Sequence, residues 1–217
     1  MKTARPGPGN EPQKLLGPRA PVYRGFIATA RPQRAVSGAM SLTFPPVAEG
    51  DLAGLIELLT SDRWPFHLDV EPTPASVEAN LAHFQPSEAQ APHWIELADE
   101  RIGLVVLREL DDPTPVFDLR LKATHRRRGL GRATLAWLAR ETFEAHGKHR
   151  LEGHTRADNR PMQRLFARTP GWVLEGCFRQ TWRDREAGIW RDALAYGLLA
   201  EDWRRGSETP LSQPLAG

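Results

Sequence analysis

The chain has 217 residues, of which 40% are hydrophobic and 26% are charged, and this composition is typical of one globular domain with a shorter flanking segment. The single cysteine, Cys177, excludes an internal disulfide, and no apolar segment approaches the roughly 20 residues that a membrane-spanning helix needs. The net charge of +2 is unevenly distributed, because residues 1–40 carry +6 and residues 41–217 carry −4.

Residues 1–40 contain six prolines and five glycines and show no apolar periodicity. Such a segment cannot bury enough apolar surface to offset the entropy lost on ordering, so we expect it to be disordered. Its prolines would break the amphipathic helix of a transit peptide. We interpret it as an extension ahead of a start at Met40, with a nucleic-acid- or ribosome-binding arm as the alternative. We expect the folded domain to span residues 41–205 and a flexible tail to span residues 206–217.

The first part of the domain is predicted to form one strand and two helices. Residues 41–47 are typical of a short strand, and apolar residues recur at helical spacing over residues 52–59. Thr73 followed by Pro74 indicates a second helix start, and its apolar face continues until Pro86.

Three strands are expected next. Residues 93–98 and 101–107 are separated by Asp99 and Glu100, which suit a hairpin turn. After several turn residues, the polarity of residues 117–122 alternates, which predicts a further strand.

A basic loop with two glycines follows this strand and precedes a predicted helix. Free backbone N–H groups at a helix start, together with the helix dipole, attract anions, so this arrangement indicates a phosphate site. No Gly-Lys-Ser/Thr follows, and the first glycine of the dinucleotide fingerprint is absent, so neither of those nucleotide sites fits. The loop residues are Arg126, Arg127, Arg128, Gly129, Leu130 and Gly131.

The rest of the chain alternates strand and helix and then ends in strands. Residues 150–155 are predicted to form a strand, residues 159–169 a short helix, and residues 172–178 and 190–199 the last two strands. A polar tail is expected from Asp202 onward.

The loop and its surroundings resemble the GNAT N-acetyltransferase family. The spacing R-x-x-G-x-G resembles the acyl-CoA pyrophosphate loop of that family, and Asn159 with its helix resembles the helix after the family's fifth strand. Gly171 and Trp172 are similar to the family's glycine–aromatic ending, and residues 196–199 are similar to the closing strand of the ribosomal-protein-alanine N-acetyltransferase branch. The resemblance covers roughly residues 42–203. It implies an α/β fold in which helices flank a mixed central β-sheet.

The resemblance also implies an activity. The chain would transfer the acetyl group of acetyl-CoA to a primary amine, by direct attack in a ternary complex and without a metal. The acceptor would be a protein N-terminus or a small cationic amine, and the acidic body favours a cationic acceptor. The alternative is a non-catalytic acyl-CoA-binding or regulatory module.

The acetyl-CoA site implied by the resemblance combines a strand edge, the loop and one asparagine. The strand edge would pair with the pantetheine arm through main-chain hydrogen bonds, as in strand addition. The residues are Leu119, Arg120 and Leu121 on the strand, Arg126, Arg127, Arg128, Gly129, Leu130, Gly131 and Arg132 in the loop and helix start, and Asn159 at the pantetheine arm.

Two residues depart from the family pattern. Arg127 stands where many members have glycine, which is tolerable if its side chain points to solvent. Phe166 stands where many members have a tyrosine that protonates the leaving thiolate. A phenyl ring cannot donate a proton, so water or another residue does so, or the thiolate leaves unassisted.

Acyl transfer requires a neutral amine, and this requirement suggests a catalytic base. An α-amino group with a pKa of about 7.7–8.0 needs little help, whereas a lysine with a pKa of about 10.4 needs a base or desolvation. His154 is the first candidate, because imidazole titrates near neutral pH and the related branch carries a glutamate at that position. Asp118 and Glu152 are the second candidates. The alternative is that His154 has a structural role and is held by hydrogen bonds.

The acceptor site is expected after the first helix, where the family holds its substrate. Trp64, Phe66 and His67 would form an aromatic wall there, with plain core packing as the alternative. Cys177 alternates into a strand and is expected in the core. We expect a cytoplasmic monomer or homodimer without a membrane or nucleic-acid partner, because the acidic body lacks the further basic patches that nucleic acids require.

Overall fold

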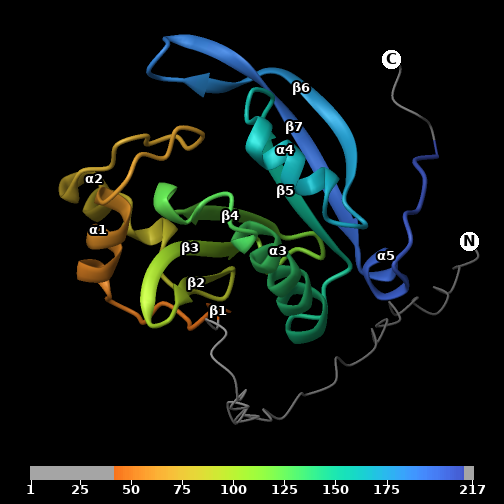
Figure 1. Ribbon diagram of the computed structural model, residues 1–217, viewed down its shortest axis with the longest axis horizontal. Coiled ribbons are helices and arrows are strands. Elements are labelled where there is room, and N and C mark those ends of the chain that lie inside the picture. Colours follow the sequence, from red (N-terminus) through yellow and green to blue (C-terminus); the bar gives the residue numbers. More distant parts are fainter. Residues whose placement is uncertain (1–41, 213–217) are drawn as a thin grey trace, which may run out of the picture. The chain divides into compact units, whose positions relative to one another are not determined.

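The structure is a computed structural model that describes residues 42–212 (Figure 1). The expected disorder of residues 1–40 lies outside the described residues, as does the end of the predicted tail at residues 213–217. Among the described residues, no helix is long and apolar enough to cross a membrane.

A seven-stranded mixed sheet forms the centre of the domain, with the strand order β1-β2-β3-β4-β5-β7-β6. Neighbouring strands are antiparallel except for β4 and β5, which are parallel. This arrangement confirms the expected fold class. The strands are β1 (Leu42–Thr43), β2 (Gln90–Leu97), β3 (Glu100–Arg108), β4 (Val116–Leu121), β5 (Arg150–Arg156), β6 (Val173–Asp184) and β7 (Ile189–Leu199).

Helices cover both faces of the sheet, and an apolar cluster fills the space between the helices and the sheet on each face. Val105 of β3 packs with Leu135 of α3 in one cluster, and its neighbour Leu104 packs with Leu55 of α1 in the other. This alternation follows from the period of two in a strand. The helices are α1 (Leu52–Thr60), α2 (Pro74–Ala79), α3 (Leu130–Arg140), α4 (Arg160–Ala167) and α5 (Ala200–Arg205), and a π-helical turn at Glu141–Ala145 extends α3.

Local sequence explains where several elements begin and turn. Asp51 caps α1 by accepting a hydrogen bond from the Gly54 N–H at 3.0 Å, and Thr73 and Ser76 form a reciprocal capping box at the start of α2. The β2–β3 hairpin turns at Ala98 and Asp99, whose φ angles are 50° and 65°. Positive φ at both central residues matches the right-handed twist of the flanking strands.

Strands β4 and β5 separate shortly after they meet. They pair at Val116 and Glu152, whereas β4 pairs with β3 over its whole length and β5 pairs with β7 over its whole length. One edge of β4 is therefore open from Phe117 onward. This gap positions the candidate site.

Two expectations near the C-terminus are wrong. Cys177 is exposed, because β6 is an edge strand with irregular register on both sides of it and the simple alternation of faces breaks down. The expected tail from Asp202 begins with α5. The Asp202 carboxylate is buried and accepts hydrogen bonds from the Ser207 hydroxyl at 3.0 Å and the Thr209 N–H at 2.9 Å, so it holds the following segment against the helix.

Candidate active site

The loop before α3 presents a set of backbone donors to solvent. Gly129 is the N-cap of α3 with a φ of 81°, and Arg127 has a φ of 61° with an exposed side chain. Within residues 42–212, no acceptor is bonded to the N–H groups of Arg127, Arg128 or Gly129. The N–H groups of Leu130 and Gly131 in the first helical turn also have no acceptor within the described residues, whereas that of Arg132 donates to the Gly129 carbonyl. These donors converge at the positive end of the helix dipole, so the loop fits a pyrophosphate.

Arg126 fixes the loop instead of extending from it. Its Nε donates to the Leu121 carbonyl at 2.8 Å, and its terminal nitrogen donates to the Arg63 carbonyl at 3.2 Å. The guanidinium therefore connects the loop to the end of β4 and to the segment after α1.

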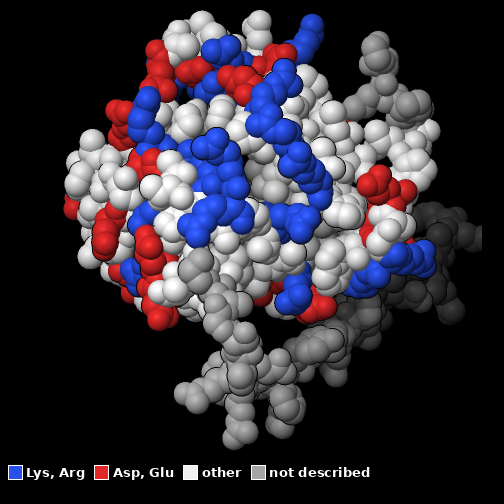
Figure 2. Space-filling model, viewed as in Figure 1, with Lys and Arg blue, Asp and Glu red and all other residues white. Residues whose placement is uncertain are grey.

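Other arginines surround the loop without ion partners. Figure 2 shows two groups of Lys and Arg side chains on this face, one over the start of α3 and one over α4. The α4 residues recur every four positions, so they follow one exposed face of that helix. The residues are Arg127, Arg128 and Arg132 at α3 and Arg160, Arg164 and Arg168 on α4, none of them ion-paired within the described part of the chain. The α4 group is absent from the sequence prediction.

The open edge of β4 leads from the loop into the domain. The Lys122 N–H donates to Ile102 of β3 at 2.9 Å, so by alternation the main-chain groups of Phe117, Leu119 and Leu121 face the gap toward β5. The Leu121 carbonyl is already bonded to Arg126. Within residues 42–212, the N–H and C=O groups of Leu119 therefore have no partner, whereas the main chain of Arg120 faces β3.

A cavity of about 710 Å³ lies beside this edge. Its walls come from the segment after α1, from α2, from β3, β4 and β5, from the start of α4, and from the end of β6 with the turn that follows it. Its size lies in the range of small-molecule sites. Of the predicted site residues, the cavity is lined by Phe66, His67, Asp118, Leu119, Arg120, His154 and Asn159.

A comparison with protein families agrees with this geometry. Residues 41–169, more than half of the chain, match the model of an acetyltransferase (GNAT) domain. The chain belongs to the GNAT acetyltransferase family. As a GNAT enzyme it uses acetyl-CoA to acetylate a primary amine, and the expectation of an acetyl-CoA-dependent N-acetyltransferase is confirmed. A comparison with curated proteins finds no significant match.

Several solved structures share the GNAT fold of this chain. Spermidine N-acetyltransferase from Vibrio cholerae in complex with CoA and spermine has a TM-score of 0.63 at 19% identity, over 75% of this chain and 98% of that one. A chimera of that enzyme with hSSAT has a TM-score of 0.63 at 20% identity, over 76% and 98% of the two chains. A dodecameric structure of the Vibrio cholerae enzyme has a TM-score of 0.59 at 20% identity, over 75% and 95%.

Two glycine positions of this GNAT domain show why the loop tolerates little change. Gly129 adopts left-handed backbone geometry, which side chains other than glycine adopt at a cost. A Cβ on Gly131 would lie 3.1 Å from the Leu165 side chain, so this glycine lets α3 approach α4 closely. Arg127 also has left-handed geometry, which explains a family preference for glycine at its position.

Asp118 is held as a carboxylate. One of its oxygens lies 2.9 Å from His67 Nε2, and the other accepts from Arg120 at 3.2 Å. Burial opposes ionisation, but the charge of Arg120 and then that of His67 outweigh it, so the pKa of Asp118 lies well below its usual range. Asp118 is consequently a weak proton acceptor at neutral pH, and its contacts position His67.

His154 and Glu152 form a second acid–imidazole pair. His154 Nε2 lies 3.2 Å from Glu152 Oε2, and 44% of the His154 side chain is exposed. Glu152 also accepts from Arg150 at 3.1 Å and does not line the cavity. Of this pair, only His154 lines the cavity.

The residues of the predicted aromatic wall lie in two places, the cavity and the core. Phe66 and His67 line the cavity, whereas Trp64 is 1% exposed and donates its indole N–H to the Leu59 carbonyl at 2.7 Å. For Trp64, the structure therefore shows core packing. Phe166 is fully buried and stacks on Tyr196 with ring centroids 4.3 Å apart, so it is away from the cavity.

Asn159 is engaged with its own helix. Its side-chain oxygen accepts from the Met162 N–H at 3.2 Å, and its amide nitrogen donates to the Thr155 hydroxyl at 2.9 Å. It therefore caps α4 at the wall of the cavity. A hydrogen bond from Asn159 to pantetheine stays a prediction.

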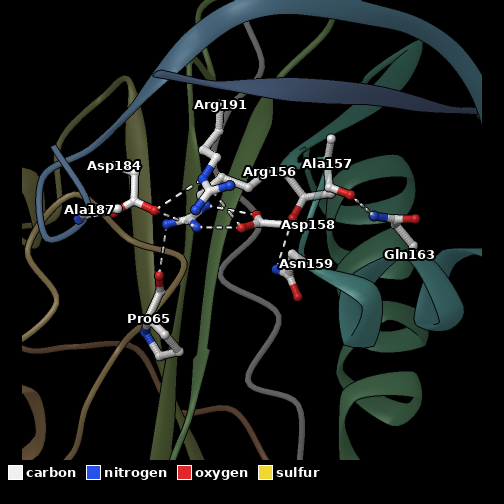
Figure 3. A network of polar contacts seen from close by, with 10 residues as sticks. Pro65, Arg156, Ala157, Asp158, Asn159, Gln163, Asp184, Ala187 and Arg191 are labelled. Carbon is white, nitrogen blue, oxygen red and sulfur yellow. Dashed lines mark hydrogen bonds and ion pairs between the residues drawn. The ribbon is translucent and has the colours of Figure 1, made fainter. Parts of the chain in front are cut away.

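A polar network that the sequence analysis missed connects segments whose neighbouring residues line the cavity (Figure 3). Arg156 at the end of β5 donates to Asp158 at 2.9 Å, to Asp184 at 3.0 Å and to the Pro65 carbonyl at 3.2 Å. Arg191 adds a bond to Asp184 at 3.2 Å. The network joins β5, the β6–β7 hairpin and the segment after α1. We call it the Arg156 network.

Proposed function

We propose that acetyl-CoA binds along the α3 loop and the open edge of β4, and that a small primary amine binds in the adjoining cavity. The separation of β4 and β5 after Val116 carries this proposal, because it leaves main-chain donors and acceptors unpaired beside the cavity. The amides of a pantetheine arm would pair with Leu119 as an added strand does. The phosphates would lie on the N–H groups of residues 127–131.

Acetyl-CoA supplies an acetyl thioester, whose carbonyl carbon is attacked by the amine. In the transfer a C–N bond forms, the C–S bond breaks, and one proton passes from the amine nitrogen to the enzyme. We assign this proton to His154, because its imidazole lines the cavity and Glu152 holds one ring nitrogen. Phe166 cannot protonate the thiolate, so solvent supplies that proton.

The cavity supports a small amine over a protein N-terminus. Its volume of about 710 Å³ suits a small molecule, and the Arg156 network connects the segments that line it. One structure with the same fold holds CoA and spermine. The protein N-terminus remains the second candidate acceptor.

The direct test is turnover with purified protein. Acetyl-CoA is mixed with short alkyl amines, diamines, amino acids and N-terminal peptides, and free thiol release and acetylated product are followed together. We expect turnover on at least one small amine that exceeds turnover on every peptide. Binding of CoA without turnover on any acceptor would favour the non-catalytic acyl-CoA module instead.

A further inference from the structure

More arginine residues than acidic residues line the acceptor cavity. The lining contains four arginines, Arg108, Arg120, Arg183 and Arg185, and two aspartates, Asp69 and Asp118. The net charge of the domain is negative, whereas the charged residues that line the cavity have a positive net charge. A bound acceptor interacts with the local charges, since the distant ones are screened by salt.

The positive charges gather around Asp118 on the face of β3 and β4 that carries α1. In the β3–β4 register Val106 lies opposite Asp118, so Arg108 is its diagonal neighbour on the same face. The two carboxylate oxygens of Asp118 are already occupied by His67 and Arg120. Asp118 therefore compensates the charge of Arg120, and the charge of Arg108 is not compensated by a direct ion pair with Asp118.

Arg108 has neutral partners. Its guanidinium donates to the Gln90 side-chain oxygen at 3.2 Å and to the His83 carbonyl at 2.9 Å, and no carboxylate of residues 42–212 forms an ion pair with it. A guanidinium has five N–H donors, so donors remain for a ligand. Burial lowers the pKa of Arg108, and the attraction of Asp118 offsets this effect incompletely.

We infer that the acceptor is an amine that also carries a carboxylate, and that Arg108 binds this carboxylate. This inference rests on the proposed function, because it places the acceptor in the same cavity. Among the described residues, a polyamine would find one carboxylate in the cavity without an arginine partner, Asp69, which accepts a hydrogen bond from the Ser76 hydroxyl at 2.7 Å. The charge of the whole domain favours a cationic acceptor, whereas this inference rests on the charges that line the cavity.

Three acceptors of matched length test the inference: γ-aminobutyrate, n-butylamine and putrescine. They share a primary amine on a four-carbon chain and differ in the charge of the far end. For the wild type we expect kcat/KM to be highest for γ-aminobutyrate and lowest for putrescine, with at least about a tenfold difference between γ-aminobutyrate and n-butylamine. Equal values, or the highest value for putrescine, would overturn the inference.

The variant Arg108→Gln assigns the effect to one residue. It keeps a side chain that can donate to the His83 carbonyl but removes the charge. We expect its KM for γ-aminobutyrate to rise about tenfold or more, with unchanged KM for n-butylamine and unchanged CoA affinity. The control is Arg140→Gln, which removes the same charge from the exposed end of α3.

The possible failures are distinguishable. Retained preference for γ-aminobutyrate in Arg108→Gln, with normal CoA affinity, would overturn the role of Arg108. Turnover that favours putrescine would overturn the inference and leave the proposed function intact. Absence of turnover on all three acceptors and on the wider amine panel would overturn the proposed function itself.

Discussion

His154 and Asp118 both line the cavity, but their surroundings suit them to different tasks. The pKa of Asp118 is lowered because the charges of Arg120 and His67 outweigh the effect of burial, so its carboxylate stays ionised and binds protons weakly. His154 is partly exposed and one of its ring nitrogens contacts Glu152. Its imidazole lines the cavity, and because Asp118 binds protons weakly, His154 is favoured over Asp118 as the base.

Replacing His154 by glutamine tests this assignment. We expect kcat/KM to fall by about 10²-fold or more, with the largest loss at low pH, where the free amine is scarce. At high pH the amine is already neutral, so the variant should approach the wild type. His146→Gln is the control, since His146 contacts Glu141 away from the cavity. A wild-type pH–rate profile for His154→Gln would exclude this role.

Asp118→Asn tests the charge cluster through stability. Removing the acid leaves Arg120 without its carboxylate, so we expect the free energy of unfolding at pH 7 to fall by about 3 kcal/mol. The folded-state pKa of Asp118 is depressed, so its contribution is complete above the unfolded value of about 3.9 and is lost as pH falls below it. Urea unfolding should therefore show a constant difference from pH 7 to 5 and a smaller one toward pH 3. A difference independent of pH would contradict the ionised carboxylate.

At the scale of elements, the Arg156 network ties three segments around the cavity. A further ion pair between Arg63 and Glu186 joins the segment after α1 to the β6–β7 turn. These contacts set the distance between the hairpin and the segment that carries Phe66 and His67, which line the cavity. The network should thus matter for the amine more than for acetyl-CoA.

The variant Arg156→Gln tests the network. We expect KM for the amine to rise about tenfold and KM for acetyl-CoA to stay within about twofold, because the network positions segments that line the acceptor cavity. Arg179→Gln, an exposed change on β6, serves as the control. Equal increases in both KM values would show that the network supports the whole fold instead.

The main helices and strands and the glycine-containing loop before α3 were predictable from local sequence patterns. Spacing of apolar residues gave the helices and strands, and the glycines with their arginines marked the start of α3. The Arg156 network was not predictable, since Asp184 and Pro65 lie 28 and 91 residues from Arg156 in the sequence. The helix α5 was missed for a related reason, because its buried Asp202 is satisfied by Ser207 and Thr209, which follow the helix.

At the scale of the whole molecule, residues 1–40 carry a net positive charge and residues 41–217 carry a net negative charge. The residues that form the loop, the β4 edge and the cavity lie within residues 42–212, whereas the net +6 belongs to residues 1–40. A chain that begins at Met40 should accordingly keep its CoA affinity and its kcat/KM within about twofold of the full chain. Calorimetry and thiol release measure both quantities. A loss of either beyond that would assign residues 1–40 a part in the site.

CoA binding at the α3 loop is the central claim, and two glycine variants test it most directly. Gly129 and Gly147 both have left-handed geometry, with φ of 81° and 62°, and both leave space for a side chain, so Gly129→Glu and Gly147→Glu impose similar backbone strain near the two ends of the extended α3 helix. Calorimetric titration with CoA should show wild-type affinity for Gly147→Glu and no measurable binding for Gly129→Glu. Equal affinity in the two variants would contradict the assignment of this loop.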